Sequence, residues 1–178
     1  MPVRLFFIVF CVIFSASTLA QTVSRGPYLQ QQDDDSIIIR WRTDSATDSV
    51  VRYGLTSASL NLTETVVGST EEHTVEITGL NPLTTYFYSI GDSSGTIAGD
   101  ATYFFHTSPV PGVATPTRFW VIGDSGTNTA AQTSHVGKAI AVRDAFKTYS
   151  AGDPADFMMM LGDNAYNSGT DAEYQEAV

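Results

Sequence analysis

The chain has 178 residues, of which 43% are hydrophobic, and carries 9 basic against 19 acidic side chains, a formal net charge of −10 at neutral pH. A chain this acidic is repelled by nucleic acid and by anionic membranes, so we expect neither as a partner. If its substrate is also an anion, the attraction has to come from a bound positive charge.

Residues 1–20 have the layout of a secretory signal peptide. Arg4 precedes an apolar run of ten residues, Leu5 to Phe14, and small residues then end the segment. A membrane-spanning helix needs roughly twenty apolar residues, so we expect cleavage before Gln21 and a secreted or periplasmic protein without a membrane anchor. The mature chain would have 158 residues with 8 basic and 19 acidic side chains, a net charge of −11. Cys11 lies in the removed part, so neither disulfides nor thiol chemistry are expected.

Residues 21–107 contain a series of short segments with the alternation of β-strands. In SIIIRWRT (residues 36–43), three large apolar side chains alternate with a second set that includes two arginines. Further strands are expected in DSVVRYG, LTETVV, HTVEITGL, TTYFYSIGD and ATYFFHT. Six or seven short strands separated by turn residues predict an all-β sandwich.

The segment GLNPLTTYFY predicts a feature typical of such sandwiches. Leu80 and Pro82 are followed by Tyr86, which suits a corner where a strand re-enters the sandwich and its tyrosine hydroxyl bonds to nearby backbone. Residues 21–107 therefore resemble a fibronectin type III domain. Within them, Asp33–Asp35 are interpreted as a solvated turn before a strand rather than a calcium site. Asn61 opens a sequon for N-glycosylation, which has meaning only where the host glycosylates secreted proteins.

A stiff linker and a different rhythm follow the predicted sandwich. Three prolines fall in TSPVPGVATPT, and we place the linker at residues 108–117. Residues 118–178 then contain an apolar strand in RFWVIG, a helix within residues 130–149 and a second apolar strand in DFMMML. Strand, helix and strand form a βαβ unit with a parallel sheet, so the FMMML segment is expected to be a strand buried on both faces.

The final segment, TDAEYQEAV, predicts the start of another helix. Thr170 or Asp171 would cap it, with Glu173 in its first turn. Two strands and about one and a half helices would leave apolar sheet faces uncovered. We therefore expect residues 118–178 to be the N-terminal part of a longer, truncated domain.

Two carboxylates follow the two strands of the βαβ unit. Asp124 comes directly after WVIG, and Asp163 comes directly after MMLG. Ligands of open parallel sheets bind beyond the carboxyl ends of the strands, so both carboxylates should face one crevice. Two such charges about 4 Å apart repel by roughly 4 kcal/mol at an effective dielectric near 20, and a shared proton or a cation must relieve this. A metal is the commoner answer where more oxygen ligands are near, and Tyr166 offers a phenolate.

These residues form two motifs with a family resemblance. Residues 123–126 read GDxG, and residues 162–166 read GDxxY. Together they resemble the first two motifs of the purple acid phosphatases, within the calcineurin-like metallophosphoesterases. The segments RGPYLQ, VRYG and GLNPLTTYFY resemble the fibronectin-like domain that precedes the catalytic domain in larger members. The resemblance extends from Arg25 to the end of the chain.

The resemblance implies a mixed fold and an activity. The fold would be an all-β, fibronectin III-like sandwich followed by the start of an α/β metallophosphoesterase domain. The activity would be that of an acid phosphatase that hydrolyses small phosphate monoesters at a dinuclear metal centre. Asp124 would be a terminal ligand of Fe(III), Asp163 would bridge the two metals, and Tyr166 would bind the iron through its phenolate. The second metal would be Zn, Mn or Fe(II).

The remaining ligands that the resemblance calls for are not in this sequence. The family takes them from motifs of the forms GNH[DE], VxxH and GHxH, none of which occurs here. His73 and His106 are expected at the surface or edge of the sandwich, and His135 in the crossover helix has no histidine at i+4. We therefore expect this chain alone to bind metal weakly at best and not to turn over.

Two rival hypotheses remain open. The block around Ser125 also resembles the nucleophile motif of the GDSL/SGNH esterases, with Asn164 as the oxyanion-hole residue. Gly126 and Ala165 depart from that pattern, and the esterase hypothesis gives Tyr166 no role. The third hypothesis is a non-catalytic secreted β-sandwich that binds carbohydrate or protein.

Overall fold

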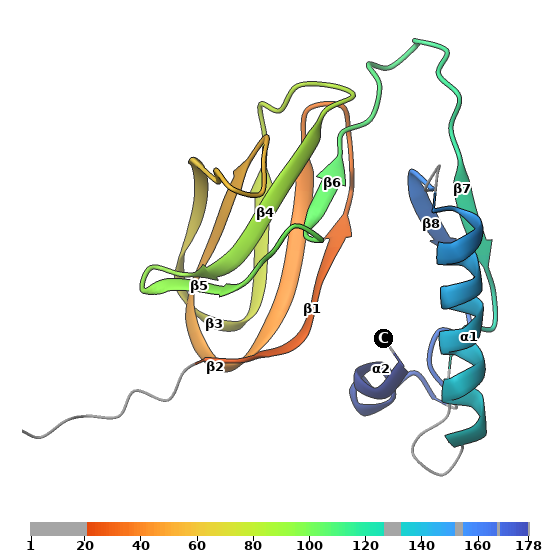
Figure 1. The fold of residues 1–178 in the computed structure, drawn as a ribbon. Coiled ribbons are helices and arrows are strands. Elements are labelled where there is room, and N and C mark those ends of the chain that lie inside the picture. The colour runs from red at the N-terminus through yellow and green to blue at the C-terminus, as the bar shows by residue number, and fades with distance from the viewer. Residues whose placement is uncertain (1–20, 127–132, 152–154, 167, 178) are drawn as a thin grey trace, which may run out of the picture.

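The computed structural model describes residues 21–126, 133–151, 155–166 and 168–177, so the predicted signal peptide with Cys11 lies outside the described residues. The first part of the chain forms an antiparallel β-sandwich, and the second part contains two parallel strands and two helices (Figure 1). The sandwich strands are β1 (Val23–Gln30), β2 (Ile37–Gly54), β3 (Leu62–Ile77), β4 (Thr85–Asp92), β5 (Gly95–Ala98) and β6 (Phe104–His106). The remaining elements are β7 (Phe119–Ile122), α1 (Thr133–Tyr149), β8 (Phe157–Met160) and α2 (Asp171–Ala177). The predicted mixed architecture is confirmed.

The strands β2 and β3 are long and take part in both halves of the sandwich. The first half of β2 pairs with β1 and β3, and its second half pairs with β3 and β4. Register shifts between Arg42 and Ser49 mark the point where the paired strands bend. The expected segments SIIIRWRT and DSVVRYG are therefore joined in β2, and LTETVV and HTVEITGL are joined in β3. The predicted ends of these strands were wrong because backbone pairing continues around the bend.

The alternation predicted for β2 sets the core. Ile37 and Ile39 are fully buried and Trp41 is 1% exposed, while the residues between them are partly exposed. One apolar cluster fills the space between the layers: Ile37, Ile39, Trp41, Val51, Tyr53, Val75, Ile77, Leu80, Tyr86, Tyr88, Ile90 and Phe105. The sandwich therefore has a continuous core of its own, as a domain requires.

The predicted tyrosine corner is present at the start of β4. The hydroxyl of Tyr86, a buried residue, accepts a hydrogen bond from the backbone N–H of Asn81 at 3.0 Å. The Thr107 hydroxyl donates to the Asn81 carbonyl at 2.6 Å and accepts from the Thr84 N–H at 2.9 Å. These hydrogen bonds hold the loop before β4 against Tyr86 in β4 and against Thr107, which follows β6.

One strand, β5, lies outside the segments expected from sequence. It forms a hairpin with β4 through a turn in which the Asp92 carboxylate accepts bonds from the N–H groups of Ser94 and Gly95 at 2.7 and 3.0 Å. A Cβ at Gly91 would lie 2.0 Å from the Gly95 carbonyl oxygen, so only glycine fits there. Four residues of GTIA are too few for alternation to reveal a strand.

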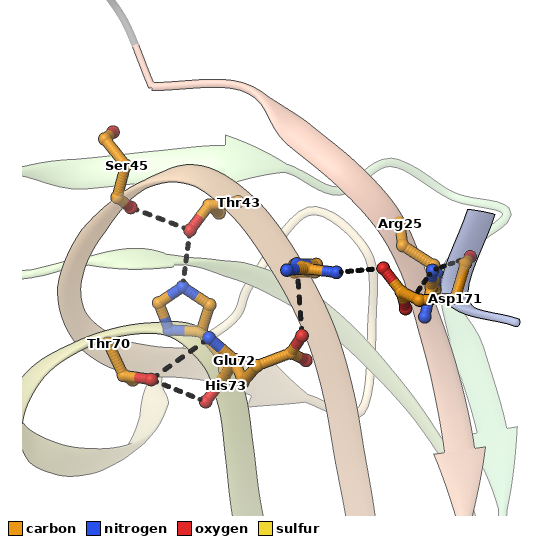
Figure 2. Close-up of polar contacts among 8 residues, drawn as sticks. Arg25, Thr43, Ser45, Thr70, Glu72, His73 and Asp171 are labelled. Carbon is orange, nitrogen blue, oxygen red and sulfur yellow. Dashed lines mark hydrogen bonds and ion pairs between the residues drawn. The ribbon is translucent and has the colours of Figure 1, made fainter. Parts of the chain in front are cut away.

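His73 corrects an expectation, because it is 1% exposed rather than at the surface or edge. Its ring stacks on that of Trp41, its cross-strand partner, with 4.7 Å between centroids. The Thr43 hydroxyl donates to the Ser45 carbonyl and contacts His73 Nε2 at 2.7 Å, as Figure 2 shows. The Thr43 oxygen therefore accepts a hydrogen bond from Nε2–H, and the Ser49 hydroxyl donates one to Nδ1 at 2.8 Å. His106 is exposed on β6, as expected.

The second part of the chain forms the predicted βαβ unit. The strands β7 and β8 pair in parallel, with Phe119 opposite Phe157 and Ile122 opposite Met160. Helix α1 contacts this sheet through Phe146, whose ring stacks on Trp120 with 4.1 Å between centroids. Residues 108–117 contain neither helix nor strand and connect β6 with β7. His135 belongs to α1, but its side chain lies outside the described part of the chain.

The exposure of β8 corrects another expectation. The four side chains of Phe157–Met160 are between 40% and 51% exposed, although this strand was expected to be buried on both faces. The described residues supply no neighbouring layer for much of this sheet. Among the described helices, none is both long and apolar enough to cross a membrane.

Candidate metal centre

The candidate ligands Asp124 and Asp163 lie just beyond the carboxyl ends of β7 and β8. Backbone hydrogen bonds continue past both strands: Leu161 N–H donates to the Ile122 carbonyl at 2.9 Å, and Asp124 N–H donates to the Gly162 carbonyl at 3.2 Å. The two loops therefore leave the sheet side by side. The predicted βαβ unit requires both carboxylates at one edge of its sheet, and the structure has them there.

Both aspartates adopt a backbone conformation that residues with a Cβ rarely take. The φ angle is 56° at Asp124 and 54° at Asp163, in the left-handed region. Such positions cost of order 1 kcal/mol or more and cluster at binding and catalytic sites. Gly162, at φ 121°, takes a conformation that favours glycine and starts the turn that brings Asp163 to the rim.

Gly126 allows the two loops to touch. Its N–H donates to the Asp163 carbonyl at 2.8 Å. A Cβ at this position would lie 2.6 Å from the Asp163 carbonyl oxygen and 2.7 Å from the Ala165 nitrogen. The final glycine of the GDxG motif is therefore required by a backbone-to-backbone contact, which gives a physical reason for the motif.

Tyr166 joins the two carboxylates. Its hydroxyl bonds to Asp124 Oδ1 and, at 2.8 Å, to Asp163 Oδ2. The structure thus brings all three predicted ligand residues together at one point. Their role as metal ligands stays a prediction, because the geometry shows only that their oxygens converge.

The chemistry of this donor set fits a hard, positively charged ion. It consists of two exposed carboxylates and one phenol, all oxygen donors, which suit iron, manganese or magnesium rather than a soft metal. In the described part of the chain no group of three or more His, Cys, Asp and Glu side chains converges. The third member here is a tyrosine, and the two histidines whose side chains are described, His73 and His106, lie in the sandwich. The described residues therefore present one side of a site.

Ser125 and Asn164 lie in the same two loops but form no hydrolase dyad. Ser125 Oγ and Asn164 Oδ1 are both buried and have no hydrogen-bond partner within the described residues. A serine nucleophile needs a base within hydrogen-bond reach and access to its substrate. Among the described residues no base lies within reach of Ser125 Oγ, and that atom is buried, so the described geometry favours the metal hypothesis over the esterase.

The architecture defines a class: a fibronectin type III-like sandwich followed by a βαβ unit with an oxygen-donor cluster at its rim. Residues 25–107 match the family model of the purple acid phosphatase N-terminal domain. The resemblance of this part of the chain to the N-terminal domain of the purple acid phosphatases, a family of phosphoesterases, is therefore confirmed.

Solved structures give further likenesses. PhoD superposes with a TM-score of 0.60 at 16% sequence identity over 88% of this chain and 30% of the PhoD chain, so the two share a fold. This chain thus spans less than a third of that protein. The fibronectin type III domain of human contactin 1 matches with a TM-score of 0.40 at 18% identity, over 61% of this chain and 93% of its own. No curated protein matches the sequence.

Proposed function

We propose that this chain is the N-terminal part of a secreted acid phosphatase that hydrolyses small phosphate monoesters at a dinuclear metal centre. The observation that carries the proposal is the convergence of Asp124, Asp163 and Tyr166 at the rim of a parallel sheet, behind a purple acid phosphatase N-terminal domain. Signal-peptide cleavage before Gln21 belongs to the same proposal. Mass spectrometry of the exported protein tests it, since an intact N-terminus would contradict it.

Each residue has a distinct part in the proposed site. By the family resemblance, Asp163 would be the ligand shared by both metals, while Asp124 would hold the ferric ion from the other loop. Tyr166 would bind the same iron as a phenolate. A pair of bound metals would lower the pKa of a coordinated water to about 7 and neutralise the charge of phosphate.

Net charge supports the need for cations at this site. The predicted mature chain has a charge of −11, and the two aspartates add local negative charge where a phosphate ester would approach. Without bound metal this rim repels phosphate. With metals held by the same carboxylates, the sign of the local field is reversed. The second metal would be Zn, Mn or Fe(II), and its other ligands would come from outside the residues described.

The test compares matched variants in the protein that contains these residues together with the later ligand motifs. Asp163→Asn removes the bridging charge at nearly constant shape and should abolish hydrolysis of p-nitrophenyl phosphate. Ser125→Ala should retain most of it. Tyr166→Phe should remove the visible absorbance band of a ferric phenolate. If Ser125→Ala lost activity while Asp163→Asn retained it, the result would contradict the proposal and favour the esterase.

A further inference from the structure

Asp171, the first residue of α2, connects the second part of the chain to the sandwich. Its carboxylate accepts a hydrogen bond from Arg25 of β1 at 2.9 Å and another from Arg42 of β2 at 3.0 Å. Arg25 also donates to the Asp171 carbonyl at 3.2 Å. Figure 2 shows Asp171 beside the labelled Arg25, and Figure 1 shows α2 lying between the sandwich and the βαβ unit. One carboxylate is thus held by two guanidinium groups from neighbouring strands.

Arg42 is itself held in place by a second carboxylate. Arg42 also pairs with Glu72 of β3 at 3.0 Å, so the contact is a network of four charges on three strands and a helix. The side chains of Arg25 and Arg42 are 19% and 30% exposed, whereas that of Asp171 is 68% exposed. Single exposed ion pairs stabilise little, but networks with fixed geometry are the exception. Hydrogen bonds from Arg25 and Arg42 lower the pKa of Asp171, which keeps it charged in acid.

Asp171 lies shortly after the loop that carries two candidate metal ligands, and the residues just before it are hydrogen-bonded to the start of α2. Thr170 caps α2: its N–H and hydroxyl donate to the Glu173 carboxylate at 2.8 and 3.1 Å, and Glu173 N–H donates back to the hydroxyl at 3.3 Å. Ser168 N–H donates to the same carboxylate at 3.1 Å. Tyr166 lies five positions before Asp171. A displacement of the helix start therefore also moves Ser168, which lies two positions after Tyr166.

We propose that Arg25 and Arg42 are positioning residues for the candidate metal centre: by holding Asp171, the sandwich fixes the far end of the loop that presents Asp163 and Tyr166. We call this contact the arginine clamp. The near end of the loop is fixed by β8 and by the Gly126 contact, so the clamp supplies the second anchor. The inference rests on the proposed function, since it gives the N-terminal domain a part in ordering the ligand loop.

Four sets of substitutions distinguish an effect of the arginine clamp on the ligand loop from an effect on the stability of the whole chain. Asp171→Asn removes the charge of an exposed side chain at constant shape, and the double variant Arg25→Gln/Arg42→Gln removes both partners. The double variant Arg25→Lys/Arg42→Lys keeps both positive charges and should hold Asp171 in part. It should not hold Asp171 fully, because lysine lacks the planar fork of arginine. Arg143→Gln is the control: it removes an exposed cation whose partner, Asp144, is on the same helix.

Amide hydrogen exchange of the whole chain provides the deciding measurement. We expect exchange in peptides that cover Leu161–Tyr166 to accelerate about fivefold in Asp171→Asn and in the Gln double variant, the factor that corresponds to about 1 kcal/mol. Exchange in β2 and β3 and in the Arg143→Gln control should be unchanged. Unchanged exchange in Leu161–Tyr166, or acceleration across the whole sandwich, would overturn the inference.

A second measurement separates the clamp from the proposed function. This measurement uses the protein that contains these residues together with the later ligand motifs. Titration of that protein with ferric nitrilotriacetate, followed by visible absorbance, reports ferric binding by the phenolate of Tyr166. We expect the clamp variants to need about fivefold more iron for the same absorbance. If no band forms in the parent chain while exchange behaves as expected, the clamp stands and the metal assignment fails. If the band forms and is equally strong in all variants, the positioning role fails.

Discussion

The buried imidazole of His73 predicts an acid-sensitive sandwich. Burial lowers the pKa of His73 below its usual 6.5, and the negative charges of Glu72, Asp48 and Asp92 offset this only in part. A group with a lowered pKa in the folded state binds fewer protons there than in the unfolded chain. Its contribution to stability is therefore complete above pH 6.5 and declines as the pH falls below that value.

The size of the effect follows from one proton. If His73 stays neutral in the folded state, only the unfolded chain binds a proton at His73 on acidification. The free energy of unfolding then falls by about 1.4 kcal/mol between pH 7.5 and pH 5.5. This is an upper limit, since partial protonation of the folded state reduces it. The substitution His73→Phe keeps a ring beside Trp41 but cannot titrate. It leaves the Ser49 hydroxyl without its acceptor, which costs about 1–3 kcal/mol at pH 7.5.

Urea unfolding followed by tryptophan fluorescence measures both effects. The parent chain should be the more stable at pH 7.5, and its advantage over His73→Phe should shrink by up to about 1.4 kcal/mol at pH 5.5. The exposed His106 supplies the control, because His106→Gln should lose as much stability on acidification as the parent. An advantage over His73→Phe that is the same at both pH values would refute the argument, as would a control that removes the acid sensitivity.

Two further substitutions test the corner and the loop contact. Tyr86→Phe removes the acceptor for the Asn81 N–H and should lower the free energy of unfolding, measured in urea, by about 1–2 kcal/mol. An unchanged urea midpoint would show that the corner hydrogen bond does not stabilise the sandwich. Gly126→Ala places a Cβ 2.6 Å from the Asp163 carbonyl, so the ferric absorbance band should weaken while the sandwich unfolds at the same urea concentration. Gly95→Ala, where a Cβ meets nothing within 4 Å, is the control, and equal behaviour of the two would contradict the contact.

The alternation of side chains was sufficient to predict most of the sandwich, and turn residues were sufficient to predict the corner. The bend in β2 was not predictable, because its continuity comes from pairing with β3 rather than from local sequence. His73 is a different case. It has the same parity in β3 as the buried Val75 and Ile77, so the pattern did indicate an inward position. His73 was nevertheless predicted at the surface or edge because histidine is polar.

The candidate site was predictable where it depends on adjacent strands. Parallel neighbours bring their carboxyl ends together, which placed Asp124 beside Asp163 without any further knowledge. The arginine clamp had no comparable signal: Asp171 is 146 positions from Arg25 and 129 from Arg42. Contacts of this kind depend on how two parts of the chain pack, which periodicity does not report.

The exposed side chains of β7 and β8 have a consequence for handling the chain. The outer edges of these two short parallel strands pair with no other described strand, so they and the apolar faces offer a template on which other strands can add, including those of a second copy. The formal charge of −10 opposes such self-association at low ionic strength. Salt at 0.1 M largely screens this repulsion between charges that are more than about 10 Å apart. Concentrated or saline solutions of these 178 residues should therefore aggregate through the second part of the chain while the sandwich stays folded.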